Sequence, residues 1–176
     1  MVLIADRIRL FDCLEFNEQF RWIDVMSEIA FVVMDFDFHH HRDFGFQFLN
    51  RYLWVTGDYA GLELLSLYLV YRAMVRAKVA GIRCRQSGGD SSENADLFAH
   101  LKLAQSYIAL PRANLYITHG YSGSGKSWWS ERIARLLPAI HIRSDVERTR
   151  DNNANGKAEP GAGRYDARTI ARNYER

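Results

Sequence analysis

Eight residues beginning at Gly120 constrain the fold of this chain more than any other stretch. They read Gly-Tyr-Ser-Gly-Ser-Gly-Lys-Ser and fit the pattern G-x-x-x-x-G-K-[S/T]. A short apolar run, residues 115–119, precedes them, and an amphipathic stretch, residues 127–137, follows. This order predicts a strand, a loop whose backbone N–H groups surround an anion, and a helix whose N-terminus faces the same anion. The pattern therefore predicts a phosphate-binding loop.

The residue types in the loop indicate ATP with Mg²⁺ as the ligand. The glycines allow the backbone to wrap so that successive N–H groups point inward. Lys126 is expected to contact the β and γ phosphates as a point charge, and the Ser127 hydroxyl to hold Mg²⁺. The predicted nucleotide-binding residues are Gly120, Tyr121, Ser122, Gly123, Ser124, Gly125, Lys126, Ser127 and Arg148.

A second predicted strand, residues 139–143, ends just before a carboxylate. Asp145 at its tip could orient or deprotonate an acceptor hydroxyl, or bind Mg²⁺ through water, and is predicted to be catalytic together with Lys126. Arg148, one helical turn further on, could grip phosphate oxygens. The alternative is that Asp145 caps a helix and Arg148 is a solvated side chain.

The first half of the chain reads as a short β element followed by helices. Loose alternation predicts a strand or hairpin that ends near Glu15, and Asn17 is expected to cap a helix running past Val33. An apolar stripe that includes Leu69 and Ala73 predicts a long helix. This long helix covers residues 59–83, and two further helices are predicted over residues 42–55 and 93–110. The glycine- and serine-rich residues 86–92 suggest a domain boundary. The predicted parts are residues 1–86, a linker and connecting helix at 87–112, and residues 113–176.

Composition and charge limit the classes of partner. The chain has 23 basic and 21 acidic residues, which gives no strong signal for a nucleic-acid or membrane partner. Residues 113–176 hold 11 basic and seven acidic side chains, a bias that suits an anionic ligand. Cys13 and Cys84 form no disulfide or metal-site pattern, and the sequence shows no targeting segment. A soluble cytoplasmic protein is expected, of unknown oligomeric state.

Two stretches of the second half resemble known kinases. Residues 120–127 together with 143–148 are similar to the small ATP-dependent kinase branch that includes gluconate kinases, polynucleotide kinases and zeta toxins. In the first half, residues 9–17 and 21–31 resemble the back part of an aminoglycoside phosphotransferase-like domain. The two halves in this order resemble bacterial proteins described as bifunctional aminoglycoside phosphotransferase-like and ATP-binding proteins.

This resemblance implies a fold class and a set of further roles. It implies an α/β protein: a mainly helical kinase-like portion, followed by an incomplete P-loop NTPase with a parallel sheet and flanking helices. It also implies that Asp12 binds metal and that Glu28 braces the site. The His-Gly-Asp loop that carries the base in such domains has no counterpart here, so the sequence is interpreted as an internal or truncated piece that binds nucleotide weakly and turns over little.

Three functions remain open from the sequence. The first is an ATP-dependent kinase that transfers the γ-phosphoryl group to an unknown small hydroxylated acceptor. The second is a nucleotide-binding regulatory module without catalysis, in which the occupied loop changes how the helical half binds a partner. The third is a phosphotransferase that works through the N-terminal half, with Asp12 essential and Lys126 accessory.

Overall fold

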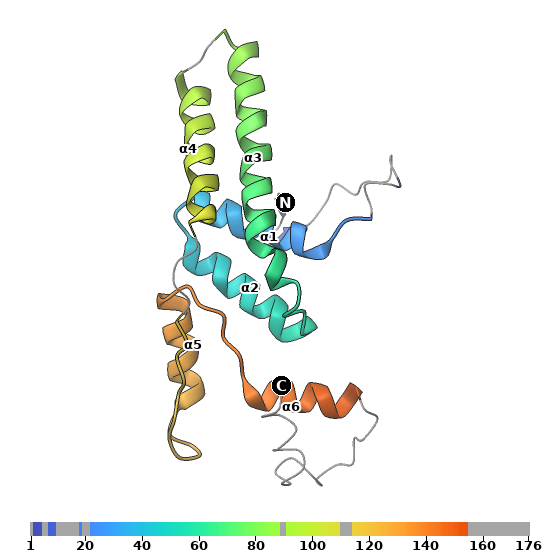
Figure 1. Ribbon diagram of the computed structural model, residues 1–176, viewed down its shortest axis with the longest axis vertical. Helices are drawn as coiled ribbons and strands as arrows, with labels where there is room; N and C mark the ends of the chain where they lie inside the picture. Colours follow the sequence, from blue (N-terminus) through green and yellow to red (C-terminus); the bar gives the residue numbers. More distant parts are fainter. Residues whose placement is uncertain are drawn as a thin grey trace.

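The computed structural model describes residues 2–4, 7–9, 18, 22–88, 91–109 and 114–154. These residues form a short antiparallel hairpin and six helices (Figure 1). In the hairpin, Leu3 pairs with Ile8. The elements are β1 (Val2–Ile4), β2 (Arg7–Arg9), α1 (Val25–Phe38), α2 (Arg42–Thr56), α3 (Leu62–Gln86), α4 (Ser91–Ile108), α5 (Lys126–Leu136) and α6 (Ser144–Ala154).

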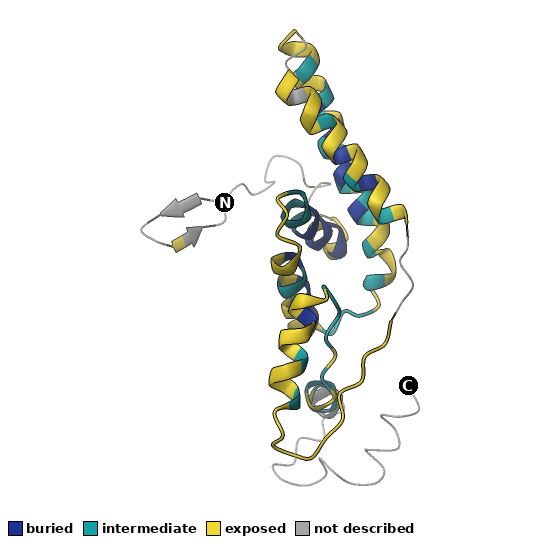
Figure 2. Cartoon of the chain, turned by 90° about the vertical axis from the view of Figure 1, so that its left-hand side faces the viewer, coloured by how far each residue is buried: buried dark blue, intermediate teal, exposed yellow. Residues whose placement is uncertain are grey.

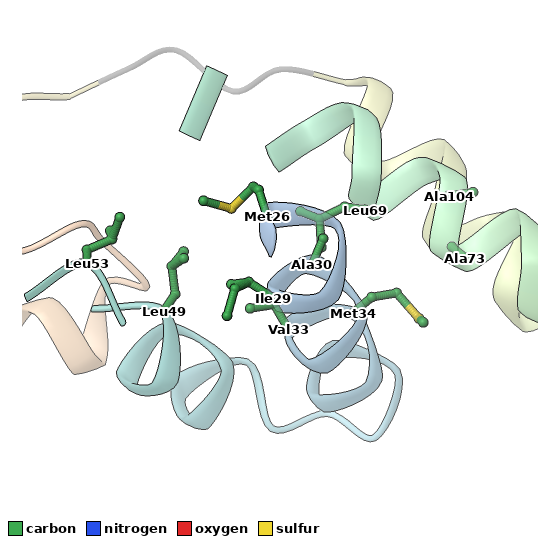
Figure 3. Packing of buried hydrophobic residues seen from close by; sticks show 10 residues of the cluster. All are labelled: Met26, Ile29, Ala30, Val33, Met34, Leu49, Leu53, Leu69, Ala73 and Ala104. Atoms are coloured by element: carbon green, nitrogen blue, oxygen red, sulfur yellow. The ribbon is translucent and has the colours of Figure 1, made fainter. Parts of the chain in front are cut away.

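The core lies where α1 packs between α2 and an antiparallel hairpin of α3 and α4. Helix α1 contacts all three of these helices, and α3 and α4 run side by side (Figure 1). Figure 3 shows the buried side chains of α1 between the leucines of α2 on one side and the residues of α3 and α4 on the other. Fully buried large side chains include Met26, Met34 and Leu49, whereas Ala73 and Ala104 allow the helices to approach closely. The helical half thus has a continuous apolar core.

The ends of α1 and α2 follow from local side-chain and backbone chemistry. Asp24 caps α1 because its carboxylate accepts the N–H of Met26 at 2.9 Å. The predicted helix from Asn17 therefore starts later, at Val25, since residues 22–24 are not helical and Asp24 supplies the cap; Asn17 itself lies outside the described residues. Helix α2 ends at Gly57, whose left-handed φ of 75° few other residues adopt.

The helices predicted for residues 42–55, 59–83 and 93–110 are confirmed as α2, α3 and α4. The apolar stripe of α3 faces the core, with Leu69 and Ala73 buried. Part of the predicted 87–112 linker belongs to the helical body, because α4 packs along α3. The proposed domain boundaries remain a prediction. The hairpin is confirmed for the paired residues 2–4 and 7–9, and residues 10–17 lie outside the described part.

The parallel sheet predicted for the second half is not formed by the residues that the structure describes. Residues 115–119 and 139–143 contain no strand, and Leu115 and Ile117 are 86% and 81% exposed. A parallel strand obtains its hydrogen bonds only from a neighbouring strand. Here the backbone of residues 139–141 is instead bonded by the side chain of Asn50 from α2. The strand predictions were therefore wrong for this structure.

None of the helices in the described ranges combines the length and apolar character that crossing a membrane requires.

Candidate functional site

The glycine-rich loop lies at the outer end of α5, in a stretch that Figure 2 shows as exposed throughout. Gly123 and Gly125 both have a φ of 79°, in the left-handed region that other residues enter at a cost of about 1–2 kcal/mol. Gly125 is the N-cap of α5, and its carbonyl accepts the N–H of Trp129 at 3.0 Å. The two glycines thus turn the chain directly into the helix, as the sequence motif predicts.

Lys126 folds back over the loop that precedes it. Its Nζ donates hydrogen bonds to the carbonyl oxygens of Gly120 at 2.6 Å and Tyr121 at 2.5 Å. The N–H of Ser124 closes the same turn onto the Tyr121 carbonyl at 3.2 Å. A side chain at Gly120 would place a Cβ 3.0 Å from the Ser124 hydroxyl. The ammonium group is therefore held at the loop, where the predicted phosphates would lie.

The start of α5 offers donors for an anion. In an α-helix the first N–H groups have no intrahelical partner, and the helix dipole makes this end electropositive. In α5 these groups belong to Lys126, Ser127 and Trp128, since the N–H of Trp129 is the first to bond, to Gly125. Ser127 is exposed, so its hydroxyl can reach a metal ion bound to a phosphate. The loop and first turn fit the phosphates of a magnesium nucleotide.

Asp145 is near the start of α6 and is held by an arginine. The Arg143 guanidinium donates to its two carboxylate oxygens at 3.2 and 2.7 Å. This hydrogen bond and its charge lower the pKa of Asp145 and raise the pKa of Arg143. A carboxylate with a lowered pKa is a poor general base. Of the roles that the sequence left open for Asp145, the geometry therefore favours orienting an acceptor or binding a metal over abstracting a proton.

The other predicted site residues are placed as follows. Arg148 donates to the Ser144 carbonyl at 3.1 Å, within its own helix, so this contact does not direct it to the loop. Glu28 forms an ion pair with Arg72 of α3 at 2.5 Å, an arrangement that ties α1 to α3. Asp12 lies outside the described residues. The ion pair of Glu28 and the hydrogen bond from Arg148 to the Ser144 carbonyl thus do not involve Lys126 or Ser127.

A junction that the sequence analysis missed joins the two halves of the chain. The amide of Asn50 on α2 donates to the Ala139 carbonyl at 2.9 Å and accepts the His141 N–H at 2.7 Å. This pair of bonds resembles the pairing of two strands, with a side chain in place of one of them. It fixes the segment between α5 and α6 against the helical body.

The second part of the junction lies at the C-terminal end of α2. Arg150 of α6 donates to the Trp54 carbonyl at 2.6 Å and to the Leu53 carbonyl at 3.3 Å, which satisfies helix-end acceptors. Glu147 pairs with Arg150 and accepts the Tyr59 hydroxyl at 3.1 Å. We call these contacts, together with those of Asn50, the α2 junction. They hold α6 and the segment before it at a defined position on α2.

The backbone of His141 belongs to this junction, and its side chain reaches α5. One of its ring nitrogens, Nε2, is 2.9 Å from the hydroxyl of Ser130. Burial, followed by the charge of Arg143, lowers the pKa of His141. The neutral imidazole is therefore the form that this packing favours.

Acidification should weaken the packing of residues 137–150 on α2. A histidine whose folded pKa is lowered contributes stability that is complete above the unfolded value of about 6.5 and is lost as the pH falls through the folded pKa. We expect the urea midpoint to fall between pH 7.5 and pH 5.5. The His141→Gln variant should show a smaller fall over the same interval. An identical fall in both proteins would contradict the assignment to His141. Asp145 does not contribute over this interval, because its pKa is lowered and its protonation affects stability only at lower pH.

Comparison with known protein families agrees with the prediction of a phosphate-binding loop. A family model described as an AAA domain matches residues 115–176. Uncharacterized proteins of Mycobacterium bovis and of two Mycobacterium tuberculosis strains are each 36% identical to the chain over 148 residues. No solved structure matches at a significant level. The C-terminal part of the chain is thus P-loop NTPase-like in sequence, which is the nucleotide-binding, kinase-like class that the motif predicts.

The alignment to the mycobacterial proteins covers 84% of this chain but only 29% of each relative. The chain thus spans less than a third of the length of these curated relatives. None of these matches bears on the aminoglycoside phosphotransferase-like resemblance of the first half, which stays a prediction.

Proposed function

We propose that residues 115–176 form a module that binds ATP with Mg²⁺, and that this module transfers the γ-phosphoryl group to a small hydroxylated acceptor in the whole protein. The observation that carries the proposal is the position of the Lys126 ammonium. It lies on the carbonyls of Gly120 and Tyr121, at the mouth of a loop whose glycines adopt left-handed φ angles. Phosphate oxygens can replace these carbonyls as acceptors, with stronger charge-assisted bonds.

Each group at the loop has a distinct part in this proposal. The backbone N–H groups at the start of α5 bind phosphate oxygens, and Lys126 neutralises charge that develops on the transferring group. The Ser127 hydroxyl would hold Mg²⁺, which supplies charge stabilisation and alignment when it is bound. Asp145 keeps its charge because of Arg143, so it would orient the acceptor or a metal-bound water.

Binding should depend on the phosphate chain and not on the base. We expect calorimetry on the 176-residue chain with MgCl₂ to detect ATP but not AMP, because the contacts are all directed at phosphates. Affinity should be modest, since Tyr121 is 92% exposed and Leu115 and Ile117 are similarly open. Water competes well for exposed charges at such a surface.

Three results would each contradict a different part of this account. Equal affinity for AMP and ATP would show that the phosphates are not what is recognised. Turnover by the 176-residue chain at about 1–100 per second, the usual range of kinases, would agree with the proposed chemistry but contradict the expectation that this piece turns over little. Inactivity of the whole protein toward every hydroxylated acceptor, together with retained ATP binding, would leave the binding proposal standing and remove the kinase.

We also propose that the whole protein is a fusion of a phosphotransferase-like helical half with the P-loop half. The combination of a helical half with a P-loop half supports the resemblance to aminoglycoside phosphotransferase-like and ATP-binding fusion proteins. Glu28 is then a bracing acid of the helical half, and its ion pair with Arg72 is compatible with that role. The acceptor is proposed only as a hydroxylated small molecule, because kinship of fold does not define a substrate.

A nucleotide-binding regulatory module is the second candidate, and the α2 junction favours it. Helix α5 starts at Lys126, and the segment after α5 is bonded to Asn50. A phosphate at the loop could therefore alter how the second half sits on α2. In that case MgATP should change hydrogen exchange of the α2 amides, an effect that Lys126→Ala would abolish. Unchanged exchange with a saturated loop would remove this candidate.

A further inference from the structure

A cavity of about 200 Å³ opens between α2, α5 and α6, beside the α2 junction. Its apolar wall combines Trp54 of α2 with Ala134 of α5 and Val146 of α6. Its polar groups include Gln47, Arg51 and His141. A concave site with an apolar wall and a few convergent polar groups is the usual form of a small-molecule site.

The cavity is separate from the phosphate-binding loop. Figure 1 shows the loop at the free end of α5, whereas the end of α5 nearer to α2 carries the cavity wall. The α5 residues that line it are Glu131, Ala134 and Arg135, which lie beyond the first turn that Lys126 and Ser127 begin. A ligand here would therefore occupy a second site and not the acceptor position in front of the loop.

Most charges around the cavity already have a partner. Arg135 pairs with Glu131 at 2.6 Å, and Arg143 pairs with Asp145 at 2.7 Å. Glu147 pairs with Arg150 of the same helix. These pairs neutralise one another and leave little net charge on this part of the lining.

Arg51 is the exception. Its guanidinium lies over the Trp54 ring, 5.0 Å from the ring centroid, and the guanidinium of Arg143 lies 5.2 Å from the same centroid. Within the described ranges, no carboxylate lies within ion-pair distance of it. Stacking on the ring holds the cation in place without neutralising it. Among the residues that the structure describes, Arg51 is thus the uncompensated positive charge of this lining, next to Trp54.

We propose that this cavity binds a small aromatic carboxylate. The ring packs against Ala134, Val146 and the edge of the Trp54 indole, because the guanidinium groups of Arg51 and Arg143 lie over the indole ring. The carboxylate accepts hydrogen bonds from the fork of Arg51. A single negative charge matches Arg51, the one cation of this lining that pairs with no carboxylate of the described residues. A phosphate dianion suits the site less well, because its second charge meets no second unpaired cation among the described lining residues. The proposal does not depend on nucleotide binding at residues 120–127.

The test uses benzoate as the probe and the 176-residue chain as the protein. Benzoate binding is followed by the NMR shift of the Trp54 indole N–H, assigned with a Trp54→Phe variant. Benzyl alcohol and benzylamine keep the ring but remove or invert the charge. We expect a saturable shift with benzoate, a weaker one with benzyl alcohol and none with benzylamine. Phenyl phosphate should bind more weakly than benzoate.

The Arg51→Gln variant should weaken benzoate binding about tenfold, as expected for the loss of a charge-assisted hydrogen bond. Arg51 is exposed, so the variant should fold, and circular dichroism verifies this. Arg132→Gln is the matched control, because Arg132 lies over Trp128 at 5.4 Å, the same arrangement outside this cavity. It should leave benzoate affinity unchanged, and Lys126→Ala should do so as well.

Three outcomes would overturn the proposal. One is the absence of a saturable shift with benzoate. A second is equal affinity for benzoate and benzyl alcohol, which would show that the charge of Arg51 is not used. The third is equal weakening by Arg51→Gln and Arg132→Gln, which would indicate general attraction of anions to arginine on the surface. If the unmodified chain bound benzoate but not MgATP, the proposal for the loop would be refuted and the proposal for the cavity would be supported.

Discussion

Replacing Lys126 by alanine should weaken MgATP binding on the order of 100-fold, because a phosphate would lose charge-assisted bonds worth about 1.5–3 kcal/mol each. The substitution also removes the two bonds that Nζ makes to the carbonyls of Gly120 and Tyr121. These bonds lie at the surface, so the stability of the helical body should change little. The effect is expected on ligand binding and not on folding.

Calorimetry with ATP and MgCl₂ measures this effect, and urea unfolding verifies the fold. Lys102→Ala is the matched control, since Lys102 is an exposed lysine on α4 and removes the same charge from the molecule. If both variants lost affinity equally, the loss would reflect net charge and not the position of the Lys126 ammonium. Unchanged affinity in Lys126→Ala would exclude the loop as the nucleotide site, whatever the activity of the whole protein.

The parts of the structure that the sequence predicted are those governed by neighbours along the chain. The stop of α2 at Gly57 and the start of α5 after Gly125 both depend on one glycine with a left-handed φ. The stripe of α3, with Leu69 and Ala73, depends on a period of 3.6 residues. Such signals lie within a few residues of one another, so a single sequence is sufficient to recognise them.

The missed parts depend on contacts between distant residues. Asn50 bonds to residues 139 and 141, about 90 positions away, and nothing in the sequence around an asparagine in a helix indicates this. The predicted strand at 139–143 failed for the same reason, since a strand exists only if a partner strand lies beside it. Asp145 follows that segment near the start of α6 and not at the tip of a strand, and its pairing with Arg143 was not predicted. Sequence motifs thus predicted the phosphate-binding loop but not the α2 junction, which holds the second half of the chain against α2.

The α2 junction makes a quantitative prediction at Gly57. A Cβ added there would lie 2.8 Å from Nε of Arg150 and 2.9 Å from its Cδ and Cζ, at a φ of 75°. Gly57→Ala should therefore carry two costs. The left-handed backbone costs about 1–2 kcal/mol, and Arg150 must swing away from the Trp54 and Leu53 carbonyls, which costs about 1 kcal/mol more at this partly exposed site. We expect a total loss of about 2–3 kcal/mol in the free energy of unfolding.

Gly88 provides the matched control for that prediction, because its φ is 77° and an added Cβ would meet nothing within 4 Å. Gly88→Ala should show at most the conformational cost. In an Arg150→Ala background the steric part disappears, so Gly57→Ala should there cost about as much as Gly88→Ala, and urea unfolding of the four proteins in this cycle measures the coupling. If Gly57→Ala costs the same with and without the Arg150 side chain, α6 does not dock on the end of α2. In that case a signal from the phosphate-binding loop would have no route to the helical half through Arg150.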